Sequence, residues 1–293
     1  MQKLFNTGKI KALVLFILVP GLITIFGCSK NSPVQPEEPA VYNENSDVAE
    51  SAASTIGENT GGLTDQIGDL FTMAGKTQLY KSDINDVLDK KEASYDPATG
   101  TWTIILSRER GNEVDSCYAL IGRTYTVQFI NDAGQPQMHW IVASDTASTI
   151  NFTIIEGQGR HKTPRLSQEL KNLEGTFVAT GTNTDIITVN GTYKRAAVDT
   201  ITTERFTRIH DFQTELTITD LTGPRGSKRD LSQKLSGTIT GTHTAQVTFK
   251  NDDIYKEKTI NCDINITIND GNASISVNKE IYTSNISTGE LNE

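Results

Sequence analysis

The chain has four histidines, which are the side chains most often used as zinc ligands and general bases. No two of them stand at His-x-x-x-His or His-Glu-x-x-His spacing, and no Cys-x-x-Cys pair occurs, so the sequence predicts no dedicated metal site. One of them falls on the apolar side of an alternating run, between Gly241 and Ala245, which predicts a buried, hydrogen-bonded core histidine. The four are His139, His161, His210 and His243.

Motifs that carry other chemistry are equally scarce. The chain contains no Gly-x-Ser-x-Gly elbow, no phosphate-cradling glycine loop and no dinucleotide fingerprint. Asn251-Asp252-Asp253 and Asn269-Asp270-Gly271 hold oxygen ligands, but neither follows the acidic order of a calcium-binding loop, so both are interpreted as turns. We therefore expect no catalytic residue, no cofactor and a non-enzymatic protein, although catalytic groups that assemble from distant residues would leave no motif.

Two cysteines in the body of the chain, Cys117 and Cys262, are candidates for a disulfide in an oxidising compartment. Spacing alone does not show that they meet. The alternative is two buried, reduced thiols that act as small apolar side chains.

The third cysteine, Cys28, ends an export signal. Lys3, Lys9 and Lys11 come first, residues 12–26 are apolar, and Gly27 precedes the cysteine. The apolar run is shorter than the roughly 20 residues of a membrane-spanning helix, and Pro20 and Gly21 interrupt it. The pattern favours a cleaved signal peptide over residues 1–27.

The four residues Ile25-Phe26-Gly27-Cys28 resemble the lipobox of bacterial lipoproteins. The resemblance implies cleavage before Cys28 and acylation of its thiol and new amino terminus, which would anchor the protein stably because more than one acyl chain enters the membrane. Ser29, where an aspartate would retain such a protein in the inner membrane, is similar to the sorting pattern for the outer membrane.

Loss of residues 1–27 removes three lysines and no acid, which changes the formal net charge from −9 to −12. This negative net charge favours solubility and argues against a nucleic-acid partner, because nucleic-acid binding requires a clustered basic face on the protein. The short basic groups at 108–110, 160–165 and 225–229 are predicted to be solvated loops. The acids of residues 31–70, where no lysine or arginine occurs, are likewise predicted to be solvated.

The segment 28–46 contains Pro33, Pro36 and Pro39 and little apolar material, which is typical of an extended tether. Residues 47–91 show helical spacing, and they are expected to pack on a sheet. The helical positions are Val48, Ala49, Ala52, Ala53 and Ile56, then Leu63, Ile67, Leu70, Phe71 and Ala74, then Ile84, Val87 and Leu88.

Over residues 92–293 apolar and polar residues alternate with a period of two, as in antiparallel strands with one solvent-exposed face. The clearest runs are Ile239 to Phe249 and Ile260 to Ile268, and Asn269-Asp270-Gly271-Asn272 is a strong hairpin signal. We predict a mainly β protein: a large antiparallel meander, either a sandwich or an open or half barrel, with a short helical N-terminal portion.

The body resembles, in composition only, the uncharacterised β-rich envelope lipoproteins of Gram-negative bacteria. The resemblance implies a lipid-anchored, outer-membrane-associated module that binds or scaffolds, with a protein, a glycan or a hydrophobic ligand as its partner. The main alternative is a carrier that holds a lipid or another hydrophobic ligand inside a barrel-like fold. A hydrolase without a recognisable motif is a third alternative.

Overall fold

The structure is a computed structural model, and it describes residues 43–75, 90–202, 207–226, 231–251 and 254–292. Two helices come first, α1 (Glu44–Ile56) and α2 (Leu63–Met73), and strands follow. The strands are β1 (Lys90–Asp96), β2 (Thr101–Arg110), β3 (Tyr118–Ile130), β4 (Pro136–Gln137), β5 (Ile141–Val142), β6 (Asp145–Thr146), β7 (Thr149–Lys162), β8 (Leu166–Thr180), β9 (Ile186–Thr202), β10 (Thr207–Pro224), β11 (Ser236–Asn251), β12 (Ile254–Asn269), β13 (Asn272–Val277), β14 (Glu280–Asn285) and β15 (Glu290–Leu291).

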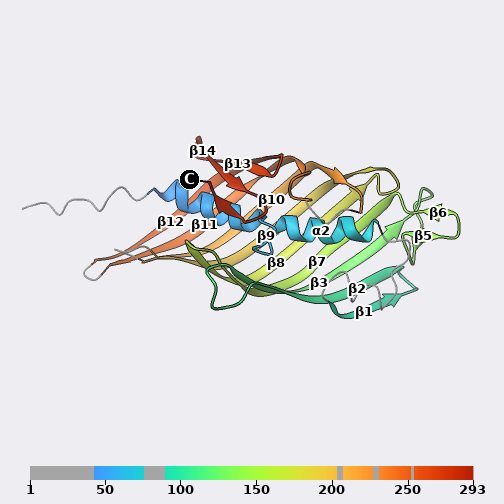
Figure 1. Cartoon of the computed structure of the whole chain (residues 1–293), viewed down its shortest axis with the longest axis horizontal. Coiled ribbons are helices and arrows are strands. Elements are labelled where there is room, and N and C mark those ends of the chain that lie inside the picture. Colours follow the sequence, from blue (N-terminus) through green and yellow to red (C-terminus); the bar gives the residue numbers. More distant parts are fainter. Residues whose placement is uncertain (1–42, 76–89, 203–206, 227–230, 252–253, 293) are drawn as a thin grey trace, which may run out of the picture. The chain divides into compact units, whose positions relative to one another are not determined.

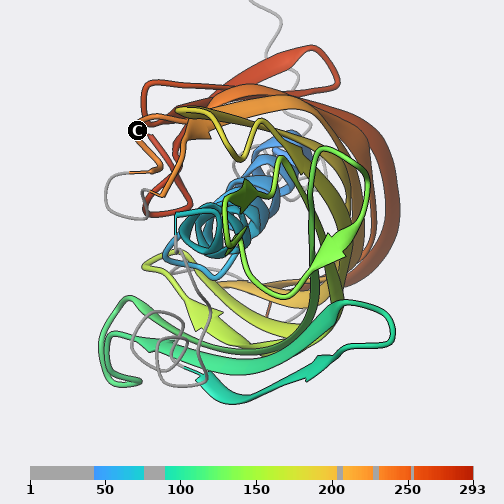
Figure 2. The ribbon, with the colours of Figure 1, turned by 90° about the vertical axis from the view of Figure 1, so that its right-hand side faces the viewer.

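One antiparallel meander contains 13 of these strands. Its order runs from β1 through β2, β3 and β7 to β15, with β4 beside β3, and β5 and β6 form a separate pair. The sheet does not close, because β1 and β15 form its two ends and do not pair with each other. Within residues 43–292 it curls around the two helices, which lie along its concave side (Figures 1 and 2). The predicted mainly β meander is confirmed, in its open form.

Local sequence explains the elements. The Asn43 side chain accepts hydrogen bonds from the amides of Asn45 and Ser46, so α1 begins at Glu44, three residues before the predicted start. The predicted hairpin turn is present: Asn269 pairs with Asn272, and Asp270 and Gly271 both have positive φ, as a type I′ turn requires. The third predicted helix, at Ile84 to Leu88, lies outside the described residues.

Strand alternation places a regular polar row on the convex face. Register aligns the same type of residue from strand to strand, and directly opposed threonines stabilise neighbouring strands by roughly 0.2–1 kcal/mol each. The row consists of Thr103, Thr126, Thr153, Thr176, Thr192, Thr217 and Thr240 on seven successive strands.

The turn between α1 and α2 connects the two ends of the open sheet. The amides of Glu58 and Asn59 donate hydrogen bonds to the carbonyls of Ile286 and Ser287, which follow β14. Near the other end of the sheet, Arg110 on β2 donates a hydrogen bond to the carbonyl of Glu58. This turn therefore contacts β2, near one end of the meander, and the residues that follow β14, near the other end.

Candidate functional site

The concave side of the sheet carries buried cations, and the helices bring buried acids to them. In residues 43–75 every formally charged side chain is acidic. Both helices are buried on nearly all sides, although their sequences contain many polar residues. The candidate site is this charged interior, which contains three neighbouring clusters.

The first cluster centres on α2. The Asp65 carboxylate lies 2.5 Å from Arg108 Nη1, 2.5 Å from Arg110 Nη2 and 2.6 Å from Arg123 Nη1. Asp69 lies 2.8 Å from Arg108 Nη2 and accepts a 3.1 Å hydrogen bond from the Tyr125 hydroxyl. These pairs bind α2 to β2 and β3.

Two groups of the first cluster, Arg108 and Tyr125, have pKa values shifted by their surroundings. Burial opposes the charge of Arg108, but Asp69 and Asp65 outweigh it and raise its pKa. Burial raises the pKa of the Tyr125 hydroxyl well above its usual value. Arg108 therefore stays charged and Tyr125 stays neutral near neutral pH.

The second cluster lies between the middle of α1 and strands β7, β8 and β9. Asp199 on β9 accepts hydrogen bonds from Ser51 Oγ at 2.5 Å and from Gln168 Nε2 at 2.6 Å. The same Gln168 uses its carbonyl oxygen to accept from Arg195 Nε at 2.8 Å. Gln168 thus connects a buried carboxylate to a buried guanidinium. Burial raises the pKa of Asp199 to about 6.

Ser54 and His161 in this cluster resemble a catalytic dyad at first sight, because Ser54 Oγ lies 2.9 Å from His161 Nε2. Arg195 Nη2 faces the other ring nitrogen, Nδ1, at 3.4 Å, and a guanidinium can only donate. Nδ1 must therefore accept, so the proton is on Nε2 and points to the serine. Burial, together with Arg195, holds the pKa of His161 well below 6.5. The pair is structural, because the imidazole has no lone pair available for the serine proton.

The third cluster joins the start of α1 to β10. Asp47 lies 2.5 Å from Arg208 Nε, and its other carboxylate oxygen accepts from Arg208 Nη2 at 2.7 Å. His210 Nε2 lies 3.2 Å from the same carboxylate. One turn further along α1, Glu50 is also buried, but its ion-pair partner Arg165 lies 3.8 Å away.

His243 occupies the position that the alternation predicts. It is fully buried on β11, its Nδ1 lies 2.9 Å from Thr214 Oγ1, and its ring stacks on Phe212 with centroids 5.0 Å apart. Burial lowers its pKa to about 3, so the ring is neutral. The prediction of a core histidine is confirmed. His139 lies beside Trp102, with ring centroids 6.2 Å apart.

The charged interior corrects two expectations. Arg108 and Arg110 lie on β2 and pair with α2, whereas a solvated loop was predicted. The acids Asp47 and Asp65 are buried ligands of arginines, whereas solvation was predicted. A signal was present in the sequence: Arg108, like Arg123 and Arg195, shares the parity of the inward-facing apolar residues on its strand.

The cysteines show no common site. Cys28 lies outside the described residues. Cys117 is exposed just before β3, Cys262 is buried on β12, and both are free thiols, so the considered disulfide is not formed in this structure. Within the described ranges, no three potential metal-binding side chains come together. No helix among those residues has the length and apolarity to cross a membrane.

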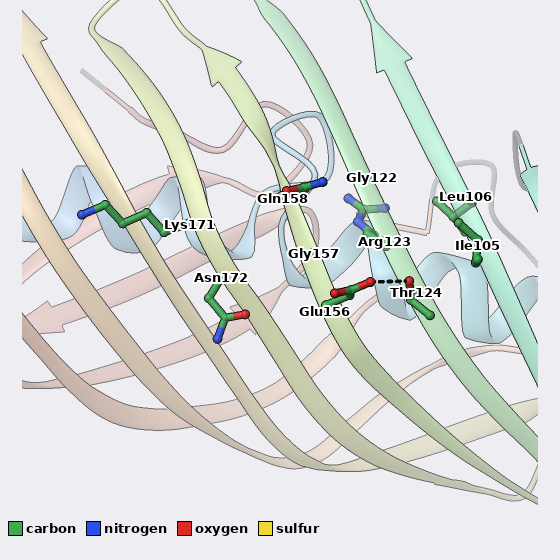
Figure 3. Close-up of a pocket in the computed structure, with 10 residues that line it drawn as sticks. All are labelled: Ile105, Leu106, Gly122, Arg123, Thr124, Glu156, Gly157, Gln158, Lys171 and Asn172. Atoms are coloured by element: carbon green, nitrogen blue, oxygen red, sulfur yellow. Dashed lines mark hydrogen bonds between the residues drawn. The ribbon is translucent and has the colours of Figure 1, made fainter.

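Two cavities border the first cluster of this interior, because Arg123 lines one of them and Arg110 lines the other. One, of about 230 Å³, opens where pairing between β7 and β8 is interrupted, between the pairs Ile154–Gly175 and Gly159–Leu170. Figure 3 shows Glu156 and Thr124 facing each other in it, joined by a 3.1 Å hydrogen bond. The other, of about 330 Å³, lies near the α1–α2 turn, and its lining includes Arg110, Cys117 and Lys162. Neither brings together an acid, a base and a nucleophile in hydrogen-bond contact.

Comparison with known proteins gives no relative from which a role could be transferred. No protein-family model, curated protein or solved structure matches the chain. The site must therefore be interpreted from its own geometry.

Proposed function

We propose that the protein is a lipid-anchored, outer-membrane-associated protein of the bacterial envelope, whose folded part is a non-enzymatic binding or scaffolding module. The evidence for the anchor is the lipobox-like sequence that ends at Cys28. The predicted tether precedes α1 in the sequence, so the anchor would be connected through it to a helix that the sheet encloses.

One observation carries the proposal of a scaffold: the chain's own helices fill the concave side of the sheet. In a carrier of hydrophobic ligands, that side would be an apolar chamber. Here Asp47, Asp65 and Asp69 meet arginines of the sheet instead. Removal of one partner from a buried ion pair costs about 3–5 kcal/mol, so exchange of the helices for a ligand would be costly.

The anchor is tested by growth of a Gram-negative host with an alkyne-tagged palmitate and detection of the label on the full chain. Wild type and a Cys117→Ala/Cys262→Ala control are expected to carry label and to sediment with outer membranes. Cys28→Ala is expected to lose both properties. Equal labelling of Cys28→Ala would refute the proposed attachment site.

The scaffold is tested separately by native mass spectrometry of the wild-type protein, extracted from membranes in mild detergent. The expected spectrum shows the acylated protein with no further small molecule. A reproducible extra mass from an apolar molecule, absent after denaturation, would refute the scaffold in favour of the carrier.

A further inference from the structure

Two acids on the same face of α1 are held very differently. Asp47 makes ion pairs with Arg208 at 2.5 and 2.7 Å. Glu50, one turn later, is only 5% exposed, yet its ion-pair contact is Arg165 at 3.8 Å, and the Arg165 side chain is half exposed. No described donor makes a hydrogen bond to the Glu50 carboxylate. A buried carboxylate without a close donor or cation is costly when it is ionised.

The charges around Glu50 increase this cost. Asp47 on α1, Asp199 on β9 and Glu290 on β15 all act on it as like charges, and Arg165 opposes them. Burial is the largest effect and raises the pKa of Glu50 to about 7. Other titratable or charged groups at the contact between α1 and the sheet include His161 on β7, Arg195 on β9, Arg208 and His210 on β10, Lys258 on β12 and Glu280 on β14.

We propose that the contact between α1 and the sheet is a pH-sensitive clamp, in which protonation of Glu50 tightens the hold on α1 and its ionisation loosens it. The proton comes from solvent and binds the carboxylate, so the clamp requires no other reactant. Since α1 follows the predicted tether in the sequence, the clamp regulates how firmly the folded part holds the segment that leads to the anchor, a role that rests on the proposed function.

The sign follows from the two pKa values. Glu50 has a pKa of about 7 when α1 is docked, and 4.5 when the helix is detached and the side chain is in water. Docked α1 therefore keeps a proton that detached α1 loses between pH 4.5 and 7, so docking weakens as pH rises through this range. His161 acts in the opposite direction, because its neutral docked form gains a proton below pH 6.5 once α1 leaves. The effect of Glu50 must be isolated by a variant.

The test is hydrogen exchange of the full chain, with the amides of residues 47–56 followed by mass spectrometry from pH 5 to pH 8 and corrected for intrinsic exchange rates. Glu50→Gln keeps the shape and removes the titration. The ratio of the opening constants of wild type and Glu50→Gln is expected to rise about 70-fold from pH 5 to pH 8. His161 is present in both proteins and cancels from this ratio.

Glu44→Gln is the matched control, because Glu44 lies on the same helix but pairs with Lys258 at the exposed end. Its ratio to wild type is expected to stay within about twofold across the pH range. A second variant, Arg165→Gln, removes the opposing cation and is expected to move the loosening of α1 to higher pH. A constant ratio for Glu50→Gln, or an Arg165→Gln profile identical to that of wild type, would overturn the proposal.

Discussion

Asp65→Asn is the substitution from which we expect the largest loss of stability for the smallest change of shape. The carboxylate of Asp65 touches Arg108, Arg110 and Arg123, and it is 1% exposed. The amide has the same size but no charge, so it leaves three guanidinium groups with Asp69 as the remaining carboxylate of the cluster. Loss of one partner from a buried ion pair costs about 3–5 kcal/mol. We expect the free energy of unfolding to fall by this amount.

Asp211→Asn provides the matched control. Lys171 Nζ lies 2.8 Å from each carboxylate oxygen of Asp211, but the side chains are 47% and 57% exposed. Exposed pairs contribute at most about 1 kcal/mol, so this variant is expected to be almost as stable as wild type. The two variants remove the same charge at similar distances from a cation and differ chiefly in burial and in the number of cations left.

Urea unfolding followed by tryptophan fluorescence measures both variants, because Trp102 and Trp140 are buried. The midpoint for Asp65→Asn is expected to fall while the slope with urea stays constant, so that the change reports stability. A loss below 1 kcal/mol for Asp65→Asn, or equal losses for the two variants, would refute the argument that this interior depends on its ion pairs.

Two further predictions concern the sheet. Gly241→Ala would place a Cβ 2.0 Å from the backbone carbonyl oxygen of Glu215, so we expect a loss of roughly 1–3 kcal/mol in a urea titration; a neutral result would show that the strands separate easily there. Burial lowers the pKa of His243 to about 3 in the folded protein, so its ring stays neutral above that pH. In the unfolded chain the same ring gains a proton below pH 6.5, so the contribution of His243 to stability should fall as the pH falls from 6.5 to 3. His243→Gln should lose less stability than wild type over that range, and identical pH profiles would contradict this reasoning.

Much of the fold follows from the sequence because strand alternation is a local signal. Alternation in residues 239–268 predicts β11 and β12 and the burial of His243, and the Asn-Asp-Gly-Asn turn predicts the hairpin that joins β12 to β13. Helical spacing likewise predicts α1 and α2. Each of these features depends on residues close together in the chain.

The charged interior could not be predicted in the same way. Arg108 lies on the inward side of its strand, but a buried arginine is favourable only beside an acid, and Asp65 is 43 residues away in the sequence. Arg208 and Asp47 are 161 residues apart. Which strand reaches which helix depends on how far the sheet curls, and that curvature has no local signature.

The α1–α2 turn has a consequence for the order in which the chain folds. It contacts Arg110 near the start of the meander and the carbonyls of Ile286 and Ser287 near its end. Contacts over such long separations are slow to form, because a large loop must close before they contribute. The helices are made first, and we expect them to stay without a complete binding surface until nearly the whole sheet has been made. The segment between β14 and β15 can join the α1–α2 turn only after the strands that precede it in the chain have been made.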